Sequence, residues 1–143
     1  MKAGTKFSPA EGRAHLSTDL RREFEENEYN GCVGTALVSE TDRVRVWHLH
    51  IPVGTRVGVH RHVLNYFWTC HAGGKSRVYY GDGRIVDQII VRGETKHIDF
   101  TAGEFLLHSV ENVGDTDLLY TTVEFLDSPN PPLSVAAAPR IPR

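Results

Sequence analysis

The sequence predicts an all-β domain preceded by one short helix. From Gly31 onward, short runs rich in valine, isoleucine, threonine and aromatic residues recur about every ten residues, with Gly, Asp, Asn and Pro between them. This spacing is typical of β-sandwiches and barrels. The segment Gly81-Asp82-Gly83 is a hairpin signal, because such residues tolerate the positive φ of tight turns. The helical pattern stands before Gly31, so the helix is expected outside the sheets.

Taken in order, residues 1–15 show no periodicity and predict an irregular lead-in. Ser17, Thr18 and Asp19 are each suitable N-caps for a helix that continues over 20–29. The predicted strands are 33–39, 43–51, 57–62, 66–71, 76–80, 85–91, 96–100, 105–110 and 118–126. The last segment holds most of the prolines and is expected to be extended, mobile or packed on a neighbour. We therefore divide the chain into a lead-in with its helix (1–30), a β domain (31–127) and a proline-bearing tail (128–143).

Composition excludes several functions. The net charge is −2, with 16 basic and 18 acidic residues and no long block of like charge, which argues against nucleic acid or a membrane as partner. The first residues lack the apolar core of a secretory signal, so we expect a cytoplasmic protein. Cys32 and Cys70 fit no zinc or redox spacing and are expected to be buried free thiols.

Three histidines form a candidate metal site. His60 and His62 are two residues apart, so in a strand their side chains share one face. His108 lies in an apolar run far downstream. Three neutral imidazoles are a common ligand set for zinc, iron, nickel or copper, so we predict one divalent transition metal of open identity. The alternative is that the first two are exposed on a strand and the third is a core histidine.

The spacing around these histidines resembles the first cupin motif, which runs glycine, His-x-His, glutamate, glycine. Here the positions are Gly54, His60, His62, Tyr66 and Gly73, with the phenol in place of the glutamate.

The second cupin motif, a P-x-G turn followed by histidine and asparagine, is similar to Thr101-Ala102-Gly103, His108 and Asn112. Threonine replaces the proline, and the gap from glycine to histidine is longer than usual. The resemblance implies a small single-domain cupin with a double-stranded β-helix (jelly roll, cupin barrel) over 31–127, a three-histidine metal site without the glutamate, and a homodimer.

The resemblance also suggests which residues contact a substrate. Tyr66 is placed near the metal, where it either donates a hydrogen bond in catalysis or fills space. Trp68 shares its strand face, and Leu106 shares that of His108, so both are candidate substrate contacts. His50 is a third candidate, although it and His48 line the pocket only if the opposite, apolar face of their strand is outside.

Two polar residues near the second motif have simpler interpretations. Glu104 shares strand parity with His108 and is a conceivable fourth ligand, but a solvated glutamate at the start of a strand is the favoured interpretation. Asn112 is expected to cap the following turn through its amide.

These features favour a metalloenzyme acting on a small oxygenated organic molecule. Iron would suit dioxygenase-like cleavage, whereas zinc or nickel would suit an isomerase, lyase or decarboxylase. Sugar epimerisation is disfavoured because the acid of the motif is missing. The alternative is a non-catalytic cupin in which the metal is structural or the barrel binds a small ligand.

Overall fold

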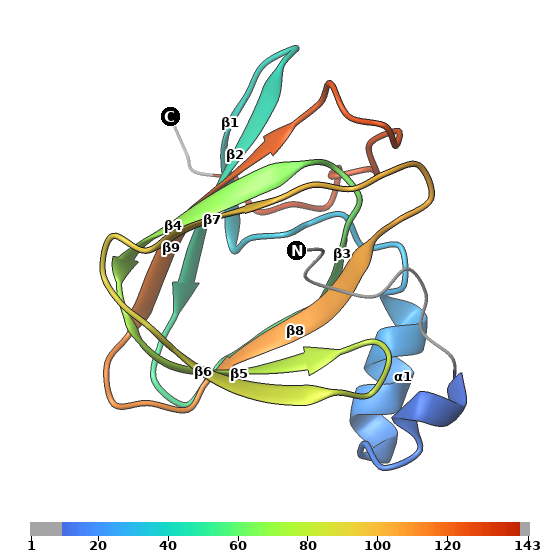
Figure 1. The fold of residues 1–143 in the computed structure, drawn as a ribbon, viewed down its shortest axis with the longest axis vertical. Coiled ribbons are helices and arrows are strands. Elements are labelled where there is room, and N and C mark those ends of the chain that lie inside the picture. The colour runs from blue at the N-terminus through green and yellow to red at the C-terminus, as the bar shows by residue number, and fades with distance from the viewer. Residues whose placement is uncertain (1–9, 141–143) are drawn as a thin grey trace.

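The computed structural model describes residues 10–140, which form two antiparallel sheets facing each other as the walls of a barrel (Figure 1). One sheet has the strand order β1-β2-β9-β4-β7 and the other β3-β8-β5-β6. Before them come a 3-10 turn (Ala10–Arg13) and helix α1 (Thr18–Glu26). The strands are β1 (Ala36–Glu40), β2 (Val44–Ile51), β3 (Arg56–His62), β4 (Tyr66–Ala72), β5 (Gly74–Tyr80), β6 (Ile85–Ile90), β7 (Thr95–Ile98), β8 (Leu106–Asn112) and β9 (Leu118–Phe125).

The double-stranded β-helix predicted from the sequence is therefore confirmed, and each predicted strand corresponds to an observed one. The Gly81-Asp82-Gly83 segment does form the hairpin between β5 and β6, and Gly83 has a φ of 96°. Each wall is built by antiparallel pairing between segments distant in sequence, β3 with β8 in one sheet and β4 with β9 in the other.

Helix α1 covers the outer side of the four-stranded sheet (Figure 1). Ser17 is its N-cap, and the Ser17 hydroxyl accepts a hydrogen bond from the Leu20 amide at 3.2 Å. Phe24 is fully buried and packs with Val59 of β3 and Leu107 of β8. The helix ends at Glu26, before the predicted end at 29. The cap that follows it is Asn27.

The two glycines that bracket the first motif, Gly54 and Gly73, are each required for a different structural reason. Gly54 has a φ of 77° in the turn that leads into β3, a conformation that side chains rarely adopt. Gly73 lies so close to β6 that an added Cβ would collide with the Ile90 carbonyl. The motif glycines therefore set how β3 starts and how β4 meets the opposite sheet.

The proline-bearing tail has bends and a turn but no helix or strand over 128–139, and it packs on its own chain. Val135 and Ala138 lie in a core cluster with Trp47 of β2. The Leu37 amide donates to the Pro139 carbonyl at 2.8 Å. The tail therefore covers the β1–β2 part of the barrel.

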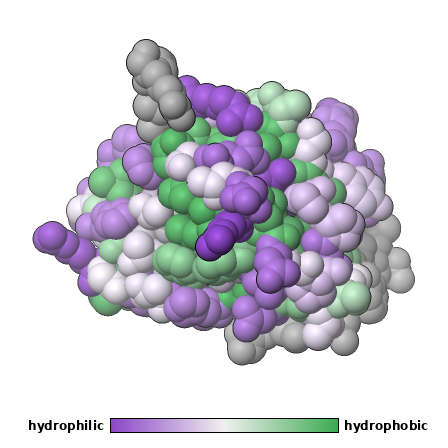
Figure 2. All heavy atoms as spheres, turned by 90° about the horizontal axis from the view of Figure 1, so that it is seen from above, coloured by the Kyte–Doolittle hydropathy of each residue, from purple (hydrophilic) through white to green (hydrophobic). Residues whose placement is uncertain are grey.

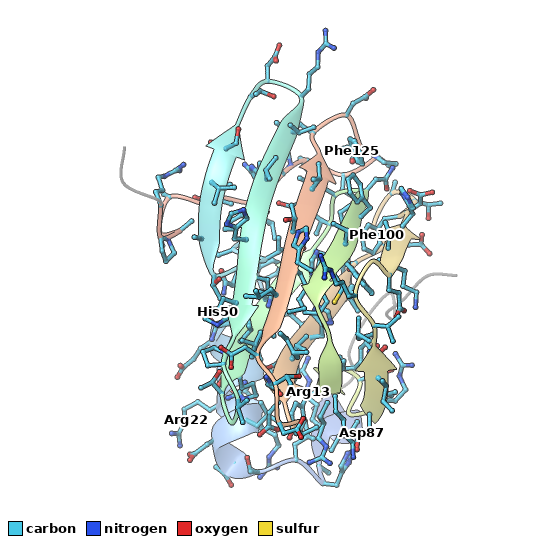
Figure 3. The ribbon with its side chains drawn as sticks, turned by 90° about the vertical axis from the view of Figure 1, so that its left-hand side faces the viewer. Arg13, Arg22, His50, Asp87, Phe100 and Phe125 are labelled. Carbon is cyan, nitrogen blue, oxygen red and sulfur yellow. The ribbon has the colours of Figure 1, made fainter. Side chains whose placement is uncertain are left out.

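The surface at the end of the molecule uppermost in Figure 1 has hydrophobic residues near its centre, with hydrophilic residues both among them and around them (Figure 2). Figure 3 shows the five-stranded sheet from outside, with side chains projecting from it along every strand. Within residues 10–140, no helix combines the length and the apolar character that a membrane span requires.

Candidate metal centre

The pairing of β3 with β8 brings the three histidines together. His60 lies opposite His108 in the ladder, and His62 lies opposite Leu106. His60 and His62 share the inner face, and a bulge between Val57 and His60 sets the register. The ring centroids of the three imidazoles are 5.0, 4.7 and 5.1 Å apart, and one ligand atom of each lies within 4.8 Å of the others.

The His62–His108 pair has the spacing of two ligands of one metal ion. The Nε2 atoms of His62 and His108 are 3.2 Å apart. Two nitrogens bound at about 2.05 Å to one ion would be separated by roughly 2.9–3.3 Å, for bond angles between octahedral and tetrahedral. Nδ1 of His60 is 2.9 Å from the Gly58 carbonyl. If Nδ1 carries the proton and donates it there, Nε2 keeps its lone pair for a metal.

Burial keeps the three imidazoles neutral. His60 and His62 are 2% and 3% exposed. Burial lowers the pKa of His60 to about 4, although the Gly58 carbonyl opposes this. Burial, with neighbouring imidazoles, holds the pKa values of His62 and His108 well below their ordinary range. Neutral imidazole is the ligand form, so the group can bind a metal near neutral pH.

Within residues 10–140, His62 has no hydrogen bond on its Nδ1, whereas a metal-bound histidine usually has one on the ring nitrogen that does not bind the metal. Its Nδ1 is buried and has no hydrogen-bond partner in the described part of the chain. Buried polar atoms without partners are rare in proteins because they cost free energy. Because no hydrogen bond from the described residues orients the His62 ring through Nδ1, its orientation depends on packing.

That packing comes from Tyr66 on the opposite wall. The rings of Tyr66 and His62 are stacked, with centroids 4.1 Å apart and an angle of 13° between their planes. Burial raises the pKa of the Tyr66 phenol far above its ordinary value, so the phenol stays protonated. The residue at the motif's glutamate position therefore offers a neutral ring and a hydroxyl where cupins with the full motif have a carboxylate.

The three histidines line a cavity of about 100 Å³ between the two sheets. Trp68 and Leu106, the predicted substrate contacts, also line it, as does Tyr66. The remaining lining residues are Val33, Leu49, Ser76, Val78, Tyr80, Gln88, Ile90, Lys96, Ile98, Val110, Tyr120 and Thr122. The lining is therefore largely apolar and aromatic, with the imidazoles as its main cluster of polar groups.

The structure does not bring His50 to this cavity. Its Nε2 lies 2.9 Å from the Asp117 carboxylate on the outer side of the sheet, at the lower part of β2 (Figure 3). His48, on the same face of β2, is exposed. The inward positions of this strand carry Trp47 and Ile51, which are buried, so the apolar set takes the interior.

The interpretation of Glu104 as a solvated side chain is wrong. Glu104 is 5% exposed, and its carboxylate accepts a hydrogen bond from the Thr101 amide at 2.6 Å. The carboxylate thereby closes the turn before β8, and it is not part of the three-histidine group. Asn112 does cap a turn: its amide donates to the Thr116 carbonyl at 2.8 Å, and its oxygen accepts from the Gly114 amide.

Sequence reasoning missed one buried acid. Glu124 of β9 is 2% exposed and accepts a hydrogen bond from the Trp47 indole at 2.7 Å. Burial raises the pKa of Glu124 to about 7. The signal was present, since Glu124 shares strand parity with the buried Leu118, Tyr120 and Thr122.

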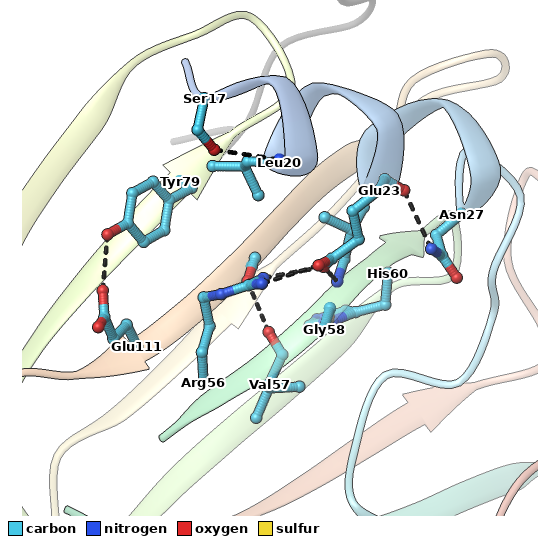
Figure 4. A network of polar contacts seen from close by, with 12 residues as sticks. Ser17, Leu20, Glu23, Asn27, Arg56, Val57, Gly58, His60, Tyr79 and Glu111 are labelled. Atoms are coloured by element: carbon cyan, nitrogen blue, oxygen red, sulfur yellow. Dashed lines mark hydrogen bonds and ion pairs between the residues drawn. The ribbon is translucent and has the colours of Figure 1, made fainter. Parts of the chain in front are cut away.

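A polar network outside the barrel holds β3 in place (Figure 4). The Glu23 carboxylate of α1 accepts two hydrogen bonds from Arg56, at 2.8 and 2.7 Å, and one from the Val59 amide at 2.8 Å. Arg56 also donates to the buried Ser109 hydroxyl of β8 at 2.6 Å. Helix α1 thus fixes both strands that carry the histidines.

Comparison with solved structures agrees with this fold. A cupin domain from Bordetella pertussis Tohama I is 25% identical, with a TM-score of 0.53 over 61% of this chain and 85% of that one. A cupin family protein with a double-stranded β-helix fold from Methanocaldococcus jannaschii is 15% identical (61% and 73% covered, TM-score 0.48). A DMSP lyase from Ruegeria pomeroyi DSS-3 is 14% identical (68% and 48% covered, TM-score 0.48).

No family model matches the sequence, and no curated protein matches it. The Bordetella structure has the highest identity and TM-score of the three, and it supports the fold assignment rather than any activity. Together with the strand topology and the histidine geometry, it identifies this chain as a cupin-fold protein whose His60, His62 and His108 can hold a metal ion.

Proposed function

We propose that this chain is a metalloenzyme that acts on a small oxygenated organic molecule. The observation that carries the proposal is the group of three neutral imidazoles, two buried and one half-buried, that line the cavity between the two sheets. Three protein ligands leave coordination positions open, as catalytic rather than structural metal sites do. Structural sites are normally closed by a fourth protein ligand, and no carboxylate or thiol of residues 10–140 belongs to this group.

The residues of the chain have separate tasks in this proposal. His60, His62 and His108 would hold one divalent ion, which supplies a Lewis acid for a substrate oxygen when bound. Tyr66, protonated and facing the cavity, would donate a hydrogen bond to the oxygen on which charge develops. Trp68 would cover the apolar part of the substrate and exclude water.

The reaction type depends on the metal. Iron would make the reaction a dioxygenase-like cleavage, and zinc or nickel would make it an isomerase, lyase or decarboxylase reaction. The cavity of about 100 Å³ lies below the usual range for drug-sized ligands, which favours a substrate of few atoms.

The test begins with metal analysis of protein purified without chelators. The stripped chain is then reloaded with iron(II), zinc, nickel or copper in turn, and each form is assayed on small diketones, hydroxyketones and catechol-like acids. Oxygen consumption separates cleavage by dioxygen from lyase or isomerase chemistry. We expect one equivalent of metal, with turnover restored by one metal only; full metal content without turnover would support the non-catalytic cupin instead.

Variants locate the site. His60→Ala, His62→Ala and His108→Ala should each lose stoichiometric metal, since two imidazoles bind far more weakly than three. His97→Ala is the matched control, because His97 is exposed on the outer side of β7 and contacts Phe67. Equal metal content in all four variants would contradict the assignment.

The remaining expectations belong to the same proposal. We propose a homodimer, to be tested by light scattering, and a cytoplasmic location, which the free thiols of Cys32 and Cys70 support. We further propose that the chain is divided into a lead-in (1–30), a barrel (31–127) and a tail (128–143). Residues 1–9 and 141–143 of these segments lie outside the described residues.

A further inference from the structure

Strand parity turns one lysine toward the metal-site cavity. In the β4–β7 ladder, Ile98 lies opposite Tyr66 and Lys96 lies opposite Trp68. Ile98 is 1% exposed and lines the cavity, and Lys96, two residues earlier on the same face, lines it as well. His97, between them, points to the other side, where its ring contacts Phe67. Lys96 therefore stands at the outer edge of the cavity.

The charge of Lys96 has no counterpart there. The cavity lining contains no carboxylate, and Lys96 is its only lysine or arginine. Within residues 10–140, no ion pair or hydrogen bond engages the Lys96 side chain. The three histidines are neutral, so a bound divalent ion would keep its full charge. Both charges make the cavity attractive to an anion.

The facing edge of the other sheet adds a hydrogen-bond donor. Gln88 of β6 lines the cavity and lies opposite the buried Ser76 of β5. Its neighbours Asp87 and Ile89 point outward, and Asp87 is held by Arg77 at 2.7 Å. The two edge strands therefore bring an ammonium and an amide to the same cavity.

We propose that the substrate is a short carboxylate, held by Lys96 and Gln88 at the outer edge while a second oxygen reaches the three histidines. This inference deepens the proposed function and rests on it. Trp68, level with Lys96, is two residues along β4 from Tyr66, which stacks on His62. Two residues of a strand span roughly 6.8 Å, which suits a short chain with an oxygen group at each end.

A different explanation makes a distinct prediction. β7 is the last strand of its sheet, and an inward lysine on an edge strand can simply prevent pairing with another chain. In that case Lys96 would have no effect on ligand affinity. The substrate proposal requires that affinity depend on the ligand's charge and on Lys96 together.

Calorimetry on the zinc-loaded full chain separates the two explanations. The probes are succinate, succinamate and succinamide, which have similar size and two, one and no negative charges. We expect the wild type to bind succinate most tightly. Lys96→Met should weaken succinate about tenfold and leave succinamide unchanged, because a charge-assisted hydrogen bond is lost. Lys96→Arg should retain most of the affinity.

Lys75→Met is the matched control, since Lys75 is exposed on β5 and does not line the cavity. It removes the same net charge and should leave succinate affinity unchanged. Equal succinate affinity in Lys96→Met and wild type, or wild-type binding of succinate no tighter than succinamide, would overturn the inference. Zinc content is measured on each sample, so a failure of the metal site would be seen separately as protein that does not retain zinc.

Discussion

We propose that Tyr66 influences which ion the three histidines bind. A carboxylate at this position would add a negative charge and favour hard cations, whereas a protonated phenol adds none. The ring instead stacks on His62, whose Nδ1 has no partner within residues 10–140. The aromatic contact thus replaces the hydrogen bond that would otherwise orient this ligand.

Changing Tyr66 should therefore change metal preference more than metal binding. Tyr66→Glu should shift the ratio of manganese(II) to zinc affinity toward manganese by roughly tenfold, because it adds a carboxylate ligand. Tyr66→Phe keeps the ring and should retain zinc with wild-type stoichiometry. Competition titrations with a chromophoric chelator measure both. An unchanged ratio in a folded Tyr66→Glu protein would show that this position does not face the ion.

Among single residues, the sequence indicated which histidines lie together but not what surrounds them. His60 and His62 were predictable because their spacing is local and lies between the motif glycines, and His108 because its surroundings resemble the second cupin motif. Lys96 and Glu124 were not singled out, since their role depends on which strand they face across the barrel, and that is a tertiary property. Glu104 was misplaced because its partner is the Thr101 amide of a turn without the usual proline.

Among the elements, β3 is the one on which the centre depends. It carries two of the three histidines, and its bulge sets which side chains face inward. The Gly58 carbonyl within this bulge lies 2.9 Å from His60 Nδ1. From outside, Glu23 of α1 holds Arg56 and the Val59 amide. The helix therefore supports the ligands without touching them.

Glu23→Ala should lower the free energy of unfolding by about 1–2 kcal/mol, because a partly buried carboxylate with three hydrogen bonds is lost. Chemical denaturation with fluorescence detection measures this, and zinc affinity should fall as well. Asp87→Ala is the control: its bidentate pair with Arg77 is exposed to solvent, which screens the charges, so its loss should lower the free energy of unfolding less than the loss of Glu23. Equal losses of unfolding free energy in the two variants would show that the contacts of Glu23 with β3 stabilise the fold no more than an exposed ion pair does.

Predictability also differed among the elements. The strands were predictable because apolar and β-branched runs alternate with turn residues, so the boundaries agree within a few residues. The order β1-β2-β9-β4-β7 was not, because pairing of β2 with β9 joins segments some 70 residues apart and leaves no local pattern. The helix was predicted too long, since its end depends on the Asn27 cap.

For the whole molecule, one buried acid links stability to pH. Glu124 lies in the interior, held by Trp47, whose cluster the C-terminal tail covers. Its pKa rises from 4.5 to about 7 on folding, because burial disfavours the charged form. Between these values the folded state holds the proton more tightly, so this group's contribution to stability falls as pH rises.

Glu124→Gln should remove that dependence, because the amide oxygen can still accept from Trp47 and carries no charge. The variant should gain stability relative to wild type between pH 4.5 and 8, by up to about 3 kcal/mol at ~1.4 kcal/mol per pKa unit. The buried histidines have the opposite pH dependence, but they are common to both proteins and cancel in the difference. Denaturation at several pH values tests this, and a difference that does not change with pH would contradict it.

The most direct test is anomalous scattering from crystals of the zinc-loaded protein, recorded above and below the zinc edge. We predict one peak inside the barrel, about 2.1 Å from a nitrogen of each of His60, His62 and His108. A peak elsewhere, or imidazoles that diverge with no ion between them, would contradict the account.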